Sequence, residues 1–417
     1  MQNHDATRRR LLRGVATAGL TLGAVGTTSA RSTVTYVVVG GSSGGLERGG
    51  FSVERELAGG SVRVVSGPAD AEGDLAAVDG IAGVTRDFEV ELADPVRESS
   101  HTGAAASDLQ WDKEVTNAFE AHDVTTGSGT RIAIVDTGVD DTHPDLGNVD
   151  TGSSRSFIDG EVGPHVGDAG QHGTHVAGIA AATGEAGVTG IAPDAELVSL
   201  RVFGAEGSAT FADVLAAADY AAEIGADAAN MSIGTEPIPP QANADGTRVA
   251  VQRVMQSVAR RGTVTTVSAG NSETDMQRGG LFTLPTSVEG VMAVSATGPN
   301  DELAFYSNYG TGEITVGAPG GGYETLEKTI DPGADVERPY PTNLVYSTIP
   351  GESYAWFAGT SMAAPQVAGL VGLVRDLDPD LNANRVESAI ARGAEGTDGR
   401  GDPELGAGRI DALDTVS

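Results

Sequence analysis

From residue 130 onward, short apolar runs alternate with Ala-rich stretches whose apolar positions recur at helical spacing. The apolar runs predict buried strands at 132–135, 197–202, 228–233, 264–268 and 291–295. The Ala-rich stretches predict helices at 172–182, 211–224 and 249–260, with a last pair of helices near the C-terminus. This alternation is typical of an α/β fold, in which helices cover both faces of a parallel sheet. Functional residues should then follow the carboxyl ends of the strands.

Residues 33–92 have a different pattern, with short β-rich runs separated by Gly and Ser turns and one helix candidate at 73–78. This pattern predicts a small α+β domain ahead of the larger one. Residues 95–107 are mostly small and polar, which is typical of a linker.

The first 30 residues contain four arginines, and Arg9-Arg10 is followed directly by Leu11-Leu12-Arg13. An uncharged stretch then extends to Ala30. A basic region, an apolar region and a small residue at the end are typical of an export signal. The arginine pair followed by two leucines resembles a twin-arginine signal, which exports folded proteins. Retention as a membrane anchor is the alternative, but 14–30 has only 17 residues, and a span needs about 20.

Acidic residues outnumber basic ones by 58 to 26, so the formal charge is −32. Such a charge argues against a nucleic acid or an anionic membrane surface as partner. The basic residues are 24 arginines and only two lysines, Lys113 and Lys328. An acidic, lysine-poor surface predicts adaptation to high salt, where ions screen its self-repulsion; an acidic secreted protein from an ordinary habitat is the alternative. The chain has no cysteine, which excludes disulfides and thiolate chemistry.

Three motifs lie where a parallel sheet would have its site. Asp136-Thr-Gly138 follows the strand at 132–135, His172-Gly-Thr-His175 begins a predicted helix, and Gly359-Thr-Ser361 begins another. Each motif alone is modest evidence. Asp-Thr-Gly also occurs in aspartic proteases, a His at a helix start is more often structural than catalytic, and Gly-Thr-Ser could be a plain N-cap.

Taken together and in this order, the motifs resemble those of the subtilisin family of serine proteases, in particular the halolysin-like enzymes of haloarchaea. The resemblance extends from about Gln110 to Leu413, and residues 33–92 are more weakly similar to the inhibitory pro-segment of that family. It implies a secreted endopeptidase that cleaves peptide bonds through an acyl-enzyme. A silent binding protein on the same fold and a membrane-tethered surface protein are the rival hypotheses; loss of a catalytic residue or a retained anchor would favour them.

The resemblance assigns Ser361 as nucleophile, His172 as its base and Asp136 as the group that orients the base. His175 is the rival base, and the family motif makes it a packing residue. Asn271, which follows the strand at 264–268, is similar to the side chain that completes the oxyanion hole in the family.

Substrate binding in the family implies strand pairing with two edges of the enzyme. The matching positions are Ser232, Ile233 and Gly234 on one edge, Gly207 and Ser208 on the other, and Gly270 beside the pocket. Thr283 falls at the floor of the pocket for the residue before the cleaved bond, and we expect a broad preference there for apolar or aromatic side chains.

A structural Ca²⁺ ion is the expected cofactor, and no catalytic cofactor is expected. Asp145 matches a family ligand, and Gln110 matches a second one. The loop at 183–188 is one residue shorter than in the family and lacks the usual Asn, so an Asp145 that only caps a turn is the alternative.

These inferences predict four segments: a signal at 1–30, a pro-segment at 31–98, a linker with the processing site at 99–109 and a peptidase domain at 110–417. The predicted partners are protein and peptide substrates and the chain's own pro-segment, which acts as an inhibitor. We expect a secreted monomer without stable membrane association. The run 320–350 is longer than a minimal family member needs, and the sequence suggests no function for it.

Overall fold

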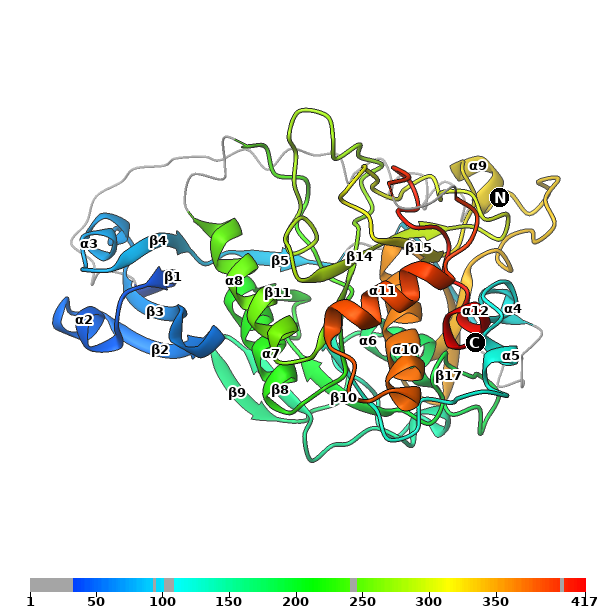
Figure 1. Cartoon of the computed structure of the whole chain (residues 1–417), viewed down its shortest axis with the longest axis horizontal. Coiled ribbons are helices and arrows are strands. Elements are labelled where there is room, and N and C mark those ends of the chain that lie inside the picture. Colours follow the sequence, from blue (N-terminus) through cyan, green and yellow to red (C-terminus); the bar gives the residue numbers. More distant parts are fainter. Residues whose placement is uncertain (1–32, 93–94, 101–108, 241–245, 398–400) are drawn as a thin grey trace.

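The computed structural model describes residues 33–92, 95–100, 109–240, 246–397 and 401–417. Figure 1 shows a small N-terminal unit that lies beside a larger one. The predicted export signal at 1–30 lies outside the described residues. Within the part of the chain that is described, no helix combines the length and the apolar character needed to cross a membrane.

The larger unit contains an eight-stranded sheet in the order β15-β14-β13-β12-β7-β10-β8-β9. Neighbouring strands run parallel except β8 and β9, which form an antiparallel pair at one edge. The strands are β7 (Arg131–Asp136), β8 (Arg155–Ile158), β9 (Glu161–Pro164), β10 (Glu196–Arg201), β12 (Ala228–Met231), β13 (Val264–Ser268), β14 (Val291–Thr297) and β15 (Val316–Pro319). The predicted α/β fold with a parallel sheet is confirmed.

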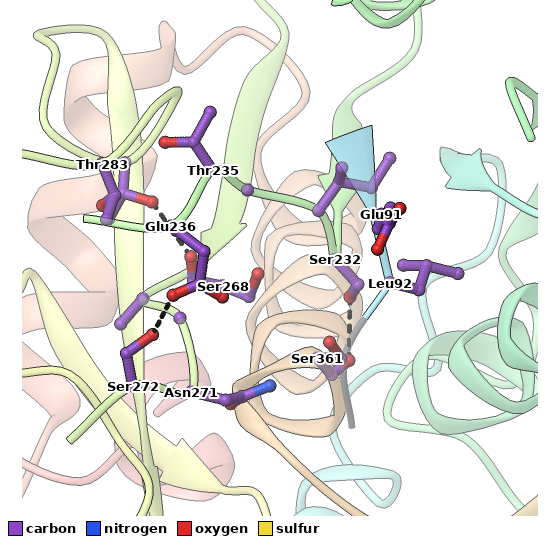
Figure 2. Close-up of a pocket in the computed structure, with 15 residues that line it drawn as sticks. Glu91, Leu92, Ser232, Thr235, Glu236, Ser268, Asn271, Ser272, Thr283 and Ser361 are labelled. Carbon is purple, nitrogen blue, oxygen red and sulfur yellow. Dashed lines mark hydrogen bonds between the residues drawn. The ribbon is translucent and has the colours of Figure 1, made fainter. Parts of the chain in front are cut away.

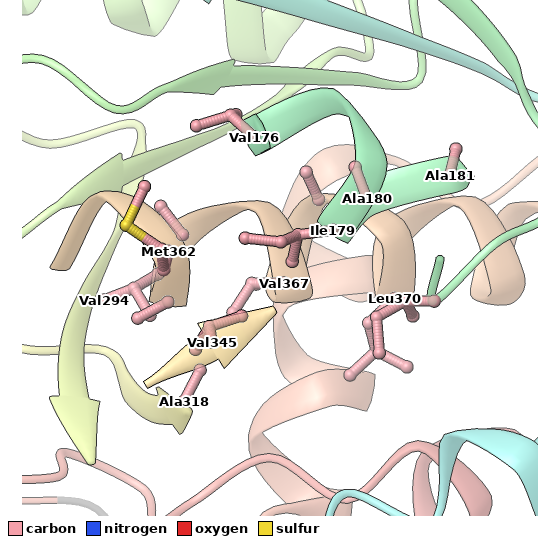
Figure 3. Packing of buried hydrophobic residues seen from close by; sticks show 14 of the residues in the cluster. Val176, Ile179, Ala180, Ala181, Val294, Ala318, Val345, Met362, Val367 and Leu370 are labelled. Carbon is pink, nitrogen blue, oxygen red and sulfur yellow. The ribbon is translucent and has the colours of Figure 1, made fainter. Parts of the chain in front are cut away.

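Alternate residues of each strand face opposite sides of the sheet, and each side has its own core. On one side Ile132 and Ile134 pack with α6 (His172–Ala181) and α10 (Thr360–Leu377), whose packing is seen in Figure 3. On the other side Ala133 and Val135 pack with α7 (Phe211–Glu223) and α8 (Thr247–Arg260). The many alanines of α6 and α7 allow the helices to approach the sheet closely.

Shorter elements surround this framework. They are α4 (Trp111–Val115), α5 (Ala118–Ala121), η3 (Pro144–Leu146), β11 (Ser208–Thr210), α9 (Leu326–Ile330), β16 (Val345–Ile349), β17 (Ser353–Ala358), α11 (Ala383–Gly393) and α12 (Ala412–Val416). The long segment 320–350 therefore contains α9 and all of β16, and its Leu344 carbonyl accepts a hydrogen bond from the buried indole of Trp111 at 2.9 Å.

The N-terminal unit is an antiparallel sheet in the order β2-β3-β1-β4 with two short helices. Its elements are β1 (Thr33–Gly40), α2 (Ser43–Arg48), β2 (Ser52–Leu57), η1 (Ala58–Gly60), β3 (Val62–Pro68), α3 (Glu72–Ala76) and β4 (Ile81–Arg86). The predicted helix at 73–78 corresponds to α3. Helix α2 was not predicted, although its N-cap Ser42 accepts a hydrogen bond from the amide of Gly45.

The two units are joined by β-strand pairing as well as by side-chain packing. Val37 and Val39 of β1 belong to the same core as α7 and α8. Beyond β4, strand β5 (Glu89–Glu91) pairs antiparallel with β11, and β6 (Val96–Ser100) pairs antiparallel with β17. The end of the predicted pro-segment is thus an ordered strand of the larger unit, whereas residues 101–108 of the predicted linker lie outside the described residues.

Candidate active site

Asp136 and His172 form a buried pair at the carboxyl edge of the sheet. Asp136 is the last residue of β7 and His172 the first residue of α6, and their side chains are at most 1% exposed. His172 Nδ1 lies 2.7 Å from Asp136 Oδ1, which also accepts a hydrogen bond from the Thr137 amide at 2.7 Å. Burial raises the pKa of the Asp136 carboxyl, and the neighbouring imidazole opposes this rise. The pair can hold the His172 ring in one tautomer.

Asp168 supports this pair from the loop that precedes α6. Its carboxylate accepts hydrogen bonds from the Thr137 hydroxyl at 2.7 Å and from the Thr174 amide in the first turn of the helix at 3.0 Å. Asp168 therefore ties the residue after Asp136 to the helix that carries His172. Asp168 was not predicted from the sequence. The signal for it is an acidic residue shortly before a helix start, where an unpaired backbone amide needs an acceptor.

His175 is fully buried and makes packing contacts. Its ring stacks on Phe357 with centroids 4.3 Å apart, and its Nε2 lies 3.1 Å from the carbonyl oxygen of Ala355. Both contacts face β17, whereas His172 faces Asp136. The geometry favours the packing role predicted for His175.

Ser361 is the second residue of α10 and is 5% exposed. Its carbonyl would normally accept a hydrogen bond from the amide of residue 365, but Pro365 has no N–H. The hydroxyl of Ser232 donates to that carbonyl at 2.8 Å, and its oxygen in turn accepts a hydrogen bond from the side-chain Nδ2 of Asn230 at 2.9 Å. The predicted substrate-binding residue Ser232 therefore also supports the backbone of Ser361.

Asn271 follows β13 and contacts the same helix terminus. Its Oδ1 accepts hydrogen bonds from the Thr360 amide at 2.9 Å and the Thr360 hydroxyl at 2.8 Å. Because both donors go to the oxygen, the side-chain amide is oriented with its nitrogen on the side of Ser361 (Figure 2). Gly270 has a φ of +101°, and a Cβ there would lie 2.5 Å from Asn308, so only glycine fits this approach.

One of the two predicted substrate edges lies beside Ser361. Ser232, Ile233, Gly234 and Gly270 line a pocket next to the Ser361 side chain, and Thr283 also lines it, as predicted (Figure 2). A Cβ on Gly234 would make only an ordinary contact at 3.6 Å, so packing does not require glycine there.

The second edge is already paired with a strand of the chain itself. Ser208 pairs with Glu91 in the antiparallel ladder of β11 and β5, and Gly207 comes directly before this ladder. Glu91 and Leu92 also line the pocket beside Ser361. The N-terminal unit thus extends its last strand into the predicted substrate cleft.

Comparison with known proteins identifies the family. The model of the subtilase family matches residues 127–408. The chain belongs to the subtilase family. Subtilisin Savinase of Lederbergia lenta is 36% identical over 287 residues, which cover 68% of this chain and 91% of that protein. Thermitase of Thermoactinomyces vulgaris is 32% identical over 314 residues, covering 74% and 96% respectively.

Solved structures share the fold of this subtilase. The epidermin leader peptide processing serine protease of Staphylococcus aureus has a TM-score of 0.77 and 21% identity, and the match covers 92% of this chain and 98% of that chain. The match includes the N-terminal unit, since it exceeds the length of the larger unit alone. This subtilase is a serine peptidase, a hydrolase whose family acts on proteins.

Asp145, the expected calcium ligand of this subtilase, is fully buried and surrounded by hydrogen-bond donors. Its Oδ1 accepts from the amides of Ala186 and Gly187 at 2.6 and 3.2 Å, and its Oδ2 accepts from the Val188 amide at 3.2 Å and the Tyr354 hydroxyl at 2.8 Å. These four donors use the lone pairs that a cation would need. Burial raises the pKa of Tyr354, and its hydrogen bond to Asp145 adds to the rise.

Gln110, the second expected ligand, is also committed to the protein. Its Oε1 accepts from the Thr189 amide at 3.0 Å, and its Nε2 donates to the Thr189 carbonyl at 2.8 Å. Calcium takes six to eight oxygen ligands, and N–H groups aimed at the same oxygens repel it. Asp145 and Gln110 do not fit a calcium site in this arrangement. Elsewhere in the described ranges, three or more His, Cys, Asp or Glu side chains are nowhere grouped to hold a metal.

Proposed function

We propose that this subtilase is a secreted serine endopeptidase that acts through Asp136, His172 and Ser361. The observation that carries the proposal is the buried pair of His172 Nδ1 and Asp136 Oδ1, 2.7 Å apart, at the sheet edge where α10 presents Ser361. A buried carboxylate that holds an imidazole beside a serine at a helix N-terminus is the arrangement that activates a serine hydroxyl.

In the proposed reaction the Ser361 oxygen attacks the substrate carbonyl while His172 takes the hydroxyl proton. Asp136 stabilises the imidazolium that forms and keeps its ring in place. The oxyanion of the tetrahedral intermediate would be stabilised by the Asn271 side-chain amide and the Ser361 backbone amide. His172 then gives its proton to the leaving amine, and water hydrolyses the acyl-enzyme by the same route.

The N-terminal unit is the proposed inhibitor of the enzyme. Support comes from β5, which occupies the edge at β11 where substrate is expected, and from Phe88, whose ring stacks on Phe211 with centroids 4.6 Å apart. Strand β6 pairs with β17, and its Val96 is 3% exposed within the core of the peptidase unit. We therefore place the cut between β5 and β6, ahead of the linker at 99–109, so that β6 stays with the enzyme.

Export and salt adaptation complete the proposal. The signal pattern at 1–30 supports export by the twin-arginine route, and the charge of −32 supports activity in high salt. A monomer is proposed, because like-charged surfaces repel one another.

The test is Ser361→Ala in the full-length chain, with Ser128→Ala at an exposed serine as matched control. Hydrolysis of casein in 2 to 3 M NaCl should be lost in the first variant and unchanged in the second. Removing this nucleophile costs subtilisin about 10⁶ in kcat, so any activity close to that of the unmodified enzyme would contradict the proposal. N-terminal sequencing of the mature protein should find a start between β5 and β6, and Ser361→Ala should stay uncut if processing is autocatalytic.

A further inference from the structure

The pocket beside Ser361 has a polar floor. Thr283 is 1% exposed, and its hydroxyl oxygen has no hydrogen-bond partner among the described residues. The neighbouring hydroxyl of Thr286 is already used, since it donates to the Ser268 carbonyl at 3.0 Å. An apolar ring pressed against Thr283 would leave its hydroxyl buried and unpaired, which is unfavourable.

The rim of the same pocket carries a carboxylate. Glu236 lines the pocket and is exposed, and in Figure 2 its side chain points toward Ser272. The Ser272 hydroxyl donates to Glu236 Oε2 at 2.8 Å, and the Ser272 amide is itself held by Asn308 Oδ1 at 3.1 Å. Glu236, which follows β12, is therefore held across the pocket by Ser272, which follows β13.

This carboxylate keeps capacity for another donor. Glu236 accepts one hydroxyl hydrogen, whereas a carboxylate has about four lone-pair positions. Within the described segments no arginine or lysine pairs with Glu236. Arg278, in the loop that carries Ser272, pairs instead with Asp275.

We propose that Glu236 and Thr283 make this pocket select lysine or arginine as the residue before the cleaved bond. This specificity rests on the proposed endopeptidase function and concerns separate substrate chains. The chain's own cut between β5 and β6, where residues 91–96 contain no lysine or arginine, is intramolecular, so tethering raises the effective concentration of that bond whatever its side chain. The aliphatic stem of the substrate side chain would fill the space between Gly234 and Gly270, and its cationic end would meet the Glu236 carboxylate. Acidic residues would be repelled. The proposal replaces the apolar or aromatic preference expected from the sequence.

The test compares substrates of one peptide sequence that differ only in that residue: lysine, arginine, norleucine, phenylalanine or glutamate. Lysine and norleucine share an aliphatic stem, so the ratio of their kcat/KM values isolates the contribution of the charge. In the mature enzyme lysine and arginine should be cleaved best and glutamate worst. Because Glu236 is exposed, the ratio should fall as NaCl rises.

Glu236→Gln should lower the lysine to norleucine ratio about threefold or more, in keeping with an exposed ion pair. Glu289→Gln removes the same charge from an exposed site outside this pocket and is the matched control; it should leave the ratio unchanged. Thr283→Val removes only the floor hydroxyl and should raise cleavage after phenylalanine relative to lysine.

A norleucine or phenylalanine preference in the unmodified enzyme, or an equal ratio in Glu236→Gln, would overturn the pocket proposal while the peptidase assignment stands. Failure to cleave any of the peptides, and casein as well, would overturn the proposed function itself.

Discussion

Protonation of Asp87 should control how tightly the N-terminal unit docks on the peptidase unit. Asp87 lies between β4 and β5, and its Oδ1 accepts hydrogen bonds from the Ala212 amide in the first turn of α7 at 2.9 Å and from the Phe88 amide at 3.0 Å. Burial at this interface raises the pKa of Asp87 from 3.8 to about 6, and the nearby Asp213 adds to the rise. The two amide hydrogen bonds only partly oppose it.

The sign and size of the effect follow from this shift. A raised pKa means that docking favours the protonated carboxyl, so this stabilisation is complete below pH 3.8 and is lost as the pH rises through about 6. About two pKa units correspond to about 3 kcal/mol at 1.36 kcal/mol per unit. Because the free carboxyl already ionises near pH 4, part of this stabilisation is lost below pH 4.5. About 2 kcal/mol of it is lost between pH 4.5 and 7.5.

The assay uses the full-length Ser361→Ala chain, which should keep its N-terminal unit attached. Asp87→Asn keeps an acceptor for the Ala212 amide but cannot ionise. Denaturant unfolding should show that this substitution raises the free energy of unfolding by about 2 kcal/mol more at pH 7.5 than at pH 4.5. Asp70→Asn, at an exposed site in the same unit, is the control for charge removal. An equal effect of Asp87→Asn at both pH values would refute the reasoning.

Three further predictions concern other parts of the molecule. EDTA should leave the Tm unchanged; a fall in Tm that Ca²⁺ reverses would instead show a metal site. Tyr354→Phe should lower the free energy of unfolding by about 1 to 3 kcal/mol, because it removes a hydrogen-bond donor from buried Asp145. Asp168→Ala should reduce kcat at least tenfold, because Asp168 positions the residue next to Asp136. Asp376→Ala is the control: Asp376 also accepts a hydrogen bond from a threonine hydroxyl, and its loss should leave kcat unchanged. The Tm should rise between 0.1 and 2 M NaCl, where the Debye length falls from about 10 Å to about 2 to 3 Å; a flat Tm would contradict salt adaptation but leave the peptidase assignment intact.

Local pattern was sufficient for the framework of this subtilase. The spacing of apolar residues identified five of the eight strands of the main sheet and the helices α6, α7 and α8, because a buried face leaves its period in the sequence. It did not identify β8, β9 and β15 at the two edges of that sheet. The motifs at Asp136 and His172 identified the buried pair at the sheet edge, since the carboxyl ends of parallel strands lie together. The motif at Ser361 indicated a helix start, and Ser361 lies in the first turn of α10. Asn271 and Ser232 also lie where the motifs indicated.

Only the tertiary structure decided what surrounds those residues. The sequence around Asp145 is the same whether the neighbouring loop directs its carbonyls or its amides toward the carboxylate. In the fold, the amides of residues 186–188 point to Asp145. The polar pocket depends on Glu236 meeting Ser272 across 36 positions, and β6 joins β17 across more than 250. Such contacts leave no period in the chain, because each is set by the packing of elements that are distant in sequence.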